Sequence, residues 1–168
     1  MARSGSKKPV NPIVLELSQL RVDSKVALVG HPLHVMLVHF PVAFVIGTLG
    51  IDVLYWWTGD DFWVRAGLWS AGMAFWSGLL ASIIGLAELL LVEGIRALEA
   101  GWSHAVAAMT LLAITGANWG ERLFNPELIL PHGLVLSLMA AIMVGFAGWH
   151  GGKLVFDHGV GVLVSPKI

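Results

Sequence analysis

Histidines are the residues of this chain whose side chains and spacing are best suited to chemistry. A neutral imidazole binds haem iron, copper and zinc, and it exchanges protons near neutral pH. The sequence holds seven of them, three within nine residues of one another and four spread over the second half: His31, His34, His39, His104, His132, His150 and His158. Which of them can act together depends on the elements that carry them.

The composition indicates a membrane protein. Hydrophobic residues make up 57% of the chain and charged residues only 12%, whereas soluble domains carry about 25% charged residues. The net charge of -1 argues against a nucleic-acid partner. The absence of cysteine excludes disulfides, thiolate metal sites and cysteine-ligated iron–sulfur clusters.

Four apolar segments are long enough to cross a bilayer, which takes about 20 residues per helix. They cover approximately residues 33–57, 64–92, 102–119 and 130–149. The connections between them are short, so consecutive helices must pack antiparallel. We therefore predict an all-α membrane protein, with four transmembrane helices in an up-down-up-down bundle over residues 31–163 and the lipid bilayer around it.

The remaining residues form two tails in this interpretation. Residues 1–30 are an N-terminal tail without the pattern of a cleavable signal peptide. Its segment 13–29 is apolar but interrupted by charges, which is compatible with an amphipathic helix on the membrane surface and equally with a tail that does not touch the membrane. Residues 164–168 are the C-terminal tail.

The distribution of positive charge predicts the orientation. We call the side of the membrane that holds the N-terminus the near side. Eight of the ten Lys and Arg residues lie there: Arg3, Lys7, Lys8, Arg21, Lys25, Arg96, Lys153 and Lys167. Cytoplasmic loops carry the excess of Lys and Arg, so both termini are expected in the cytoplasm.

Six of the seven histidines fall on this near side. His39 lies one to two turns into the first helix, above the small residues Ala43, Gly47 and Gly50, and His104 lies at a similar depth in the third. The first and third helices of such a bundle are diagonal, so a haem b between them would bridge its centre. We expect His39 and His104 to be the axial ligands. The alternates are His158, His34, His31 and His150.

Charged neighbours have expected roles around this site. Arg96 and Lys153 can pair with haem propionates at the near surface. Glu88 can hydrogen-bond a ligating imidazole or carry protons for a quinone reaction. Asp52, near the far end of the first helix, is interpreted as an interfacial carboxylate that reaches water.

Two other interpretations of the histidines remain open. Three imidazoles, with the C-terminal histidines joining those of the first helix, would suit copper or zinc. A histidine near a helix end can also be an interfacial polar residue that only bonds a carbonyl or a lipid headgroup.

Two motifs carry a resemblance to a known family. Residues 30–41 read Gly-His-Pro-Leu-His-Val-Met-Leu-Val-His-Phe-Pro, and residues 151–162 read Gly-Gly-Lys-Leu-Val-Phe-Asp-His-Gly-Val-Gly-Val. They resemble the two end signatures of a bacterial membrane family known as domain-of-unknown-function family 2231, over roughly residues 30–163. The matching histidines are His31, His34, His39, His104 and His158. The chain departs from the pattern at Glu88, where relatives often carry Asp-Trp, and at His150, where an apolar residue is common.

The resemblance implies four spanning helices in a bacterial inner membrane. Some relatives are joined to Rieske-type iron–sulfur domains or to redox dehydrogenases, which implies membrane electron transfer. We therefore predict a haem b-binding electron-transfer subunit, not a stand-alone enzyme, that exchanges electrons between a redox protein partner and quinone. The alternatives are a cofactor-free structural subunit of a larger membrane complex and a histidine-based copper- or zinc-binding membrane protein.

Overall fold

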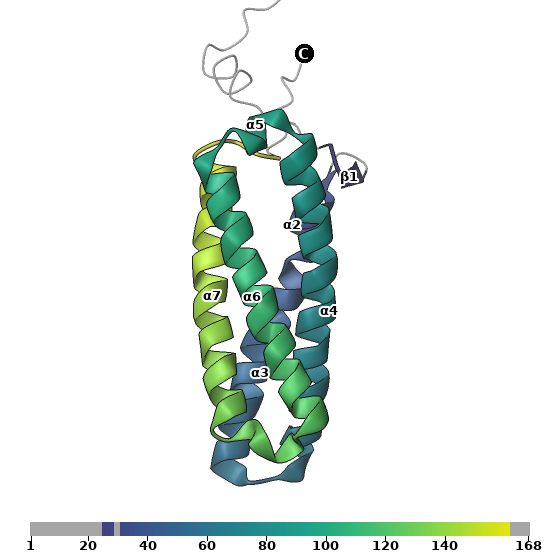
Figure 1. Ribbon diagram of the computed structural model, residues 1–168, viewed down its shortest axis with the longest axis vertical. Helices are drawn as coiled ribbons and strands as arrows, with labels where there is room; N and C mark the ends of the chain where they lie inside the picture. The colour runs from purple at the N-terminus through teal and green to yellow at the C-terminus, as the bar shows by residue number, and fades with distance from the viewer. Residues whose placement is uncertain (1–24, 29–30, 162–168) are drawn as a thin grey trace, which may run out of the picture.

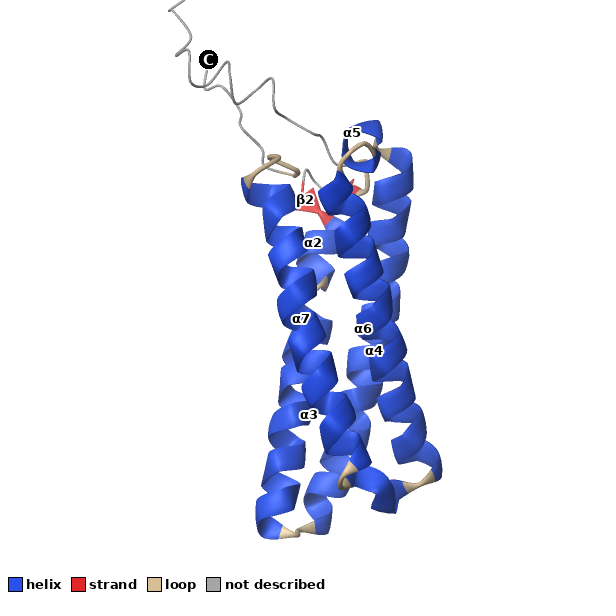
Figure 2. Ribbon diagram, turned by 60° about the vertical axis from the view of Figure 1, so that its left-hand side comes forward, coloured by secondary structure: helices blue, strands red, loops and turns tan. Residues whose placement is uncertain are grey.

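The computed structural model describes residues 25–28 and 31–161. It consists almost entirely of helices (Figures 1 and 2). In chain order the elements are β1 (Ala27–Leu28), β2 (His31–Pro32), α2 (Leu33–Leu37), α3 (His39–Thr58), α4 (Asp61–Leu91), α5 (Glu93–Arg96), α6 (Glu99–Phe124), the 3-10 helix η1 (Pro126–Ile129) and α7 (His132–Phe156). For the segment 13–29 a helix on the membrane surface is one of the two expectations given above. Most of this segment lies outside the described residues.

The predicted membrane class is confirmed. Four helical stretches are long and apolar enough to cross a bilayer, and they cover Leu33–Thr58, Asp61–Leu91, Glu99–Phe124 and His132–Phe156. The third and fourth helices extend several residues beyond the expected limits of 119 and 149. Apolar stretches underestimate a helix when its last turns carry polar residues, as the third helix does with Glu121 and Arg122.

The four long helices stand side by side, and their connections alternate between the two ends of the bundle (Figure 1). The helix pairs in contact are α3 with α4, α4 with α6, α6 with α7, and α3 with α7. The helices α3 and α6 are therefore diagonal across the bundle, as are α4 and α7. We call the end with α5 the near end and the end with η1 the far end.

The first span is interrupted at Val38, between α2 and α3. Pro41 has no amide hydrogen to donate to the carbonyl of Leu37, and its ring crowds that carbonyl. The chain stays close to helical through the break, because Val38 N donates to His34 O and Val42 N donates to Val38 O.

Local signals explain the tight connection between α3 and α4 at the far end. The helix α3 ends at Gly59, whose φ of 65° lies in the left-handed region that glycine adopts without a steric penalty. Asp60 then caps α4, because its carboxylate accepts a hydrogen bond of 2.8 Å from Phe62 N.

Small side chains fill the interior, whereas large apolar side chains cover the outside. The buried residues of α4 include Gly67, Ser70, Ala71 and Ala74, while Trp69 on the same helix is 75% exposed. Lipid tails are as apolar as these outer side chains, so the helices are held together mainly by close packing of small residues. The close approach of the helices brings polar groups of different helices within bonding distance.

Candidate functional site

Two histidines meet inside the near end of the bundle. His34 comes from α2 and His104 from the first turns of α6, the diagonal helix. Their ring centroids lie 5.8 Å apart, and the ring planes are inclined by 80°. Both side chains are half-buried. The site therefore consists of two imidazoles in an edge-to-face arrangement inside the bundle.

A backbone carbonyl of a neighbouring helix holds each ring. His34 Nδ1 lies 2.9 Å from the carbonyl oxygen of Ala81 on α4, and His104 Nδ1 lies 2.9 Å from that of Ala147 on α7. A carbonyl oxygen only accepts hydrogen bonds, so Nδ1 of each ring carries the hydrogen and donates it. Nε2 of each neutral ring then keeps its lone pair. Metal-ligating histidines are oriented in this way.

A glycine on the same neighbouring helix leaves room for each ring. Gly85 follows Ala81 by four residues, and a Cβ there would lie 2.6 Å from His34 Cε1. Gly151 follows Ala147 by four residues, and a Cβ there would lie 3.1 Å from His104 Cε1. Residues four apart lie on one face of a helix. Each histidine thus rests on an Ala-x-x-x-Gly face, a sequence signal that our sequence analysis did not use.

The structure places His39 elsewhere than expected. His39 is exposed, and its nearest hydrogen-bond contact is 3.4 Å from Nδ1 to the carbonyl of Met36 in its own turn. Ala43, Gly47 and Gly50 are exposed as well, so this face of α3 points out of the bundle. His34 and His39 are five residues apart, about 140° around a regular helix. Only one of the two can face the centre, and His34 is the one that does.

The alternate ligands lie at the same end of the bundle as the pair. His150 is half-buried on α7, next to Gly151, and His158 is half-buried in the turn that follows α7. His31 is exposed in β2. Within residues 25–28 and 31–161, no three side chains of His, Asp or Glu are close enough together to hold a metal ion. The donor set brought together at this end is therefore a pair of imidazoles.

The charged residues expected at the near end have other neighbours. Glu88 is 7% exposed on α4, and its Oε1 has no hydrogen-bond partner among the described residues. Arg96 donates from Nη1 to the carbonyl of Leu90 at 3.1 Å, and its Nη2 lies 3.7 Å from Glu93 Oε1. Lys153 is exposed near the end of α7. Their expected roles at a cofactor stay predictions.

An open groove of about 510 Å³ runs along the outside of the contact between α6 and α7. Ser103 and Ala107, on either side of His104 in the sequence, line one wall. Phe146 and His150, on either side of Ala147, line the other. The groove therefore lies beside the α6–α7 contact at which His104 bonds to Ala147.

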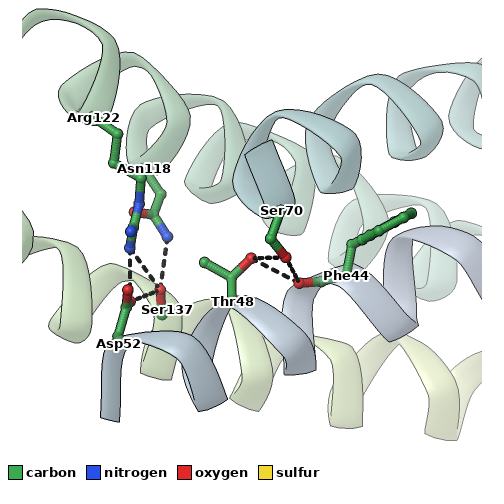
Figure 3. A network of polar contacts seen from close by, with 7 residues as sticks. All are labelled: Phe44, Thr48, Asp52, Ser70, Asn118, Arg122 and Ser137. Carbon is green, nitrogen blue, oxygen red and sulfur yellow. Dashed lines mark hydrogen bonds and ion pairs between the residues drawn. The ribbon is translucent and has the colours of Figure 1, made fainter. Parts of the chain in front are cut away.

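A second polar site, which was not predicted from the sequence, lies at the far end of the bundle. Figure 3 shows Asp52 of α3, Asn118 and Arg122 of α6, and Ser137 of α7 pointing toward one another. Asp52 Oδ2 accepts hydrogen bonds from Arg122 Nη2 at 2.7 Å and from Ser137 Oγ at 2.6 Å. Asn118 accepts from Arg122 Nε and donates to Ser137 Oγ, both at 2.9 Å. The expectation that Asp52 reaches water is wrong, because Asp52 is 0% exposed and forms an ion pair.

Two glycines make room for the guanidinium of this site. A Cβ on Gly67 would lie 2.6 Å from Arg122 Nη1, and a Cβ on Gly133 would lie 3.1 Å from Nη2. The sequence held one signal for the pair, because Asp52 lies within the first apolar segment and Arg122 lies just beyond the third, at the same end of the bundle. Charged residues within spans usually pair with each other.

Comparison with known proteins agrees with the membrane fold. No curated protein and no solved structure matches the chain. Residues 30–163 match the family described as a predicted membrane protein, DUF2231. These residues include the histidine pair and the buried ion pair, and they confirm the resemblance of the two end motifs. The chain belongs to the DUF2231 family of membrane proteins.

Proposed function

We propose that this protein is a membrane electron-transfer protein in which His34 and His104 hold haem b as axial ligands. It would exchange electrons between a redox protein partner and quinone. The observation that carries the proposal is the adjacent pair of imidazoles, each with Nδ1 bound to a carbonyl and Nε2 left with its lone pair. His34 thereby replaces His39 in the pair first expected.

The two imidazoles lie close enough together for His34 and His104 to hold one group jointly. Their ring centroids are 5.8 Å apart, and metal–nitrogen bonds are about 2 Å long.

The number of donors supports haem over zinc or copper. Protein zinc sites use three or four protein ligands, and copper sites commonly three. Haem b would need no more than the two imidazoles of His34 and His104 from this chain. When bound, haem provides one-electron chemistry at its iron.

The residues of the chain would position the group and limit water at it. The carbonyls of Ala81 and Ala147 hold Nδ1 of each ring as the hydrogen-bond donor, so Nε2 would be the nitrogen that binds the group. Gly85 and Gly151 let one edge of each imidazole approach the neighbouring helix closely, which limits rotation of the ring. Both rings are half-buried, which limits their contact with bulk water.

The quinone part of the proposal is supported by the groove beside His104. It has apolar walls with the imidazole of His150 and the hydroxyl of Ser103 among them. Such a lining suits a lipophilic ring that carries hydrogen-bond acceptors.

A cofactor-free structural subunit of a larger membrane complex is the second candidate, and the same hydrogen bonds favour it. His34 links α2 to α4, and His104 links α6 to α7. In this case the imidazoles serve only as cross-links between helices. The purified protein would then be colourless.

We further propose that the near end faces the cytoplasm of a bacterial inner membrane. The support is the excess of Lys and Arg on the near side. A cysteine placed at the exposed Asp157, just after α7, should be shielded from a membrane-impermeant thiol reagent added to intact cells. Labelling of that cysteine from outside would contradict the proposal and place the near end on the outer side of the membrane.

The reduced-minus-oxidised absorption spectrum of the protein, purified from a haem-replete host, tests the function. With a pyridine haemochrome assay it should show a b-type spectrum and one haem per chain. The variants His34→Ala and His104→Ala should lose the haem, while His39→Ala, at an exposed histidine five residues away, should keep it.

Each other outcome has a definite meaning. Wild-type protein without haem would overturn the haem proposal, and metal analysis would then separate copper or zinc from the structural subunit. Loss of haem in His39→Ala, with retention in His34→Ala, would show that His39 and not His34 is the ligand from the first span.

A further inference from the structure

A small cavity lies in the middle of the bundle, between two groups of polar side chains. Its volume is about 10 Å³, and its polar lining comes from Thr48, Thr115, Asn118 and Ser137. This volume is close to the minimum of about 10–15 Å³ that one buried water molecule requires. The other walls are small apolar side chains such as Ala74 and Ala140. Whether water binds there depends on the hydrogen bonds that the lining can offer.

The first polar group consists of Thr48 and Ser70 (Figure 3). Thr48 Oγ1 donates to the carbonyl of Phe44 at 2.7 Å and lies 2.9 Å from Ser70 Oγ. Ser70 Oγ donates to the same carbonyl at 3.1 Å. Thr48 has a single hydroxyl hydrogen, which goes to one of these two partners. Even if Ser70 donates to it, Oγ1 of Thr48 keeps a lone pair for a donor in the cavity.

The second polar group consists of Asn118, Ser137 and Thr115. It offers the cavity one donor and one acceptor. Arg122 Nε can only donate, so the oxygen of the Asn118 amide must face it, and Nδ2 must face Ser137. One hydrogen of Nδ2 goes to Ser137 Oγ, which leaves the other for the cavity. Thr115 Oγ1 donates to the carbonyl of Leu112 at 2.9 Å and keeps its lone pairs.

We propose that the cavity binds one water molecule. The water accepts a hydrogen bond from Asn118 Nδ2 and donates its two hydrogens to Thr48 Oγ1 and Thr115 Oγ1. One donor and two acceptors in the wall match the two hydrogens and the lone pairs of water, and three hydrogen bonds are typical of buried water.

The bound water has a structural consequence. It joins the two polar groups into one hydrogen-bonded chain that runs from the Phe44 carbonyl to the Asp52 carboxylate. Along α3 these two residues are about 12 Å apart. The chain then includes side chains of α3, α4, α6 and α7, so it connects all four long helices through the interior. The site is independent of the histidine pair and of any cofactor there.

Solution NMR of the threonine methyl-labelled protein in bicelles tests the site. Magnetisation transfer from water should reach the methyl groups of Thr48 and Thr115. Thr110 is the matched control, because its hydroxyl also donates to a carbonyl of its own helix at 2.9 Å, but it lies exposed on the lipid-facing side of α6. Its methyl group should show no such transfer.

The variants Ala74→Val and Thr115→Val sharpen the test. Filling the cavity or removing an acceptor should abolish the transfer from water to the Thr48 methyl group. The proposal is overturned if the wild-type protein shows no transfer at Thr48 and Thr115, or if Thr110 shows transfer of the same strength. The wild-type measurement decides the question even where a variant does not fold.

Discussion

Removing the charge of Asp52 should destabilise the protein strongly. Asp52→Leu keeps the number of side-chain heavy atoms, but the guanidinium of Arg122 loses its partner at 2.7 Å and Ser137 loses its acceptor at 2.6 Å. The exposed fraction of Arg122 is only 2%, so water does not replace the carboxylate. Breaking a buried ion pair by removing one partner costs about 3–5 kcal/mol. We expect the free energy of unfolding to fall by about this amount.

The free energy of unfolding can be measured by titrating SDS into dodecyl maltoside micelles and following the far-UV circular dichroism. Asp61→Leu is the matched control, because it makes the same substitution at an exposed Asp in the first turn of α4. Its effect should stay below about 1 kcal/mol.

A double variant separates the loss of the pair from the loss of a carboxylate. Replacing a buried ion pair by apolar residues of similar volume is often neutral or stabilising. Asp52→Leu combined with Arg122→Met should therefore be more stable than Asp52→Leu alone. The reasoning is refuted if Asp52→Leu costs less than about 1 kcal/mol, or if the double variant loses the sum of the two single effects.

Two further predictions concern the near end. Gly85→Ala should lower both stability and haem content, because the new methyl group would lie 2.6 Å from His34 Cε1. Gly145→Ala is the control, since a Cβ there meets nothing within 4 Å, and it should lower neither. Haem content by pyridine haemochrome checks this, and full haem in Gly85→Ala would contradict the proposed position of His34. A short-chain quinone should quench tryptophan fluorescence through Trp102 in the groove. Trp102→Phe should reduce the quenching and Trp76→Phe on α4 should not, whereas equal reductions would argue against a quinone in this groove.

The spans could be predicted from the sequence because hydropathy is a local property. A run of about 20 apolar residues has few alternatives to a membrane helix. The limits of the third helix were less predictable, since Arg122 looks like the end of an apolar stretch. In the folded protein its charge is neutralised by Asp52, which lies 70 residues earlier in the chain, and the helix continues to Phe124.

The choice between His34 and His39 could not be made from the sequence. In a soluble helix the apolar stripe identifies the buried face. In this first span both faces are apolar, because one meets lipid and the other meets protein. The small residues below His39 predicted a packed face, yet the face that is buried carries Pro41, Val45, Thr48 and Asp52.

The sequence by itself determined that four helices cross a membrane, which family the chain resembles, and that most histidines gather at one end. Those properties follow from composition, length and order along the chain. Only the tertiary structure decided that His34 meets His104 and that Asp52 meets Arg122. Each of these contacts joins diagonal helices, α2 and α3 of the first span with α6. Such contacts depend on the rotation of each helix about its axis, and that rotation is set by the close packing of small residues from all four helices.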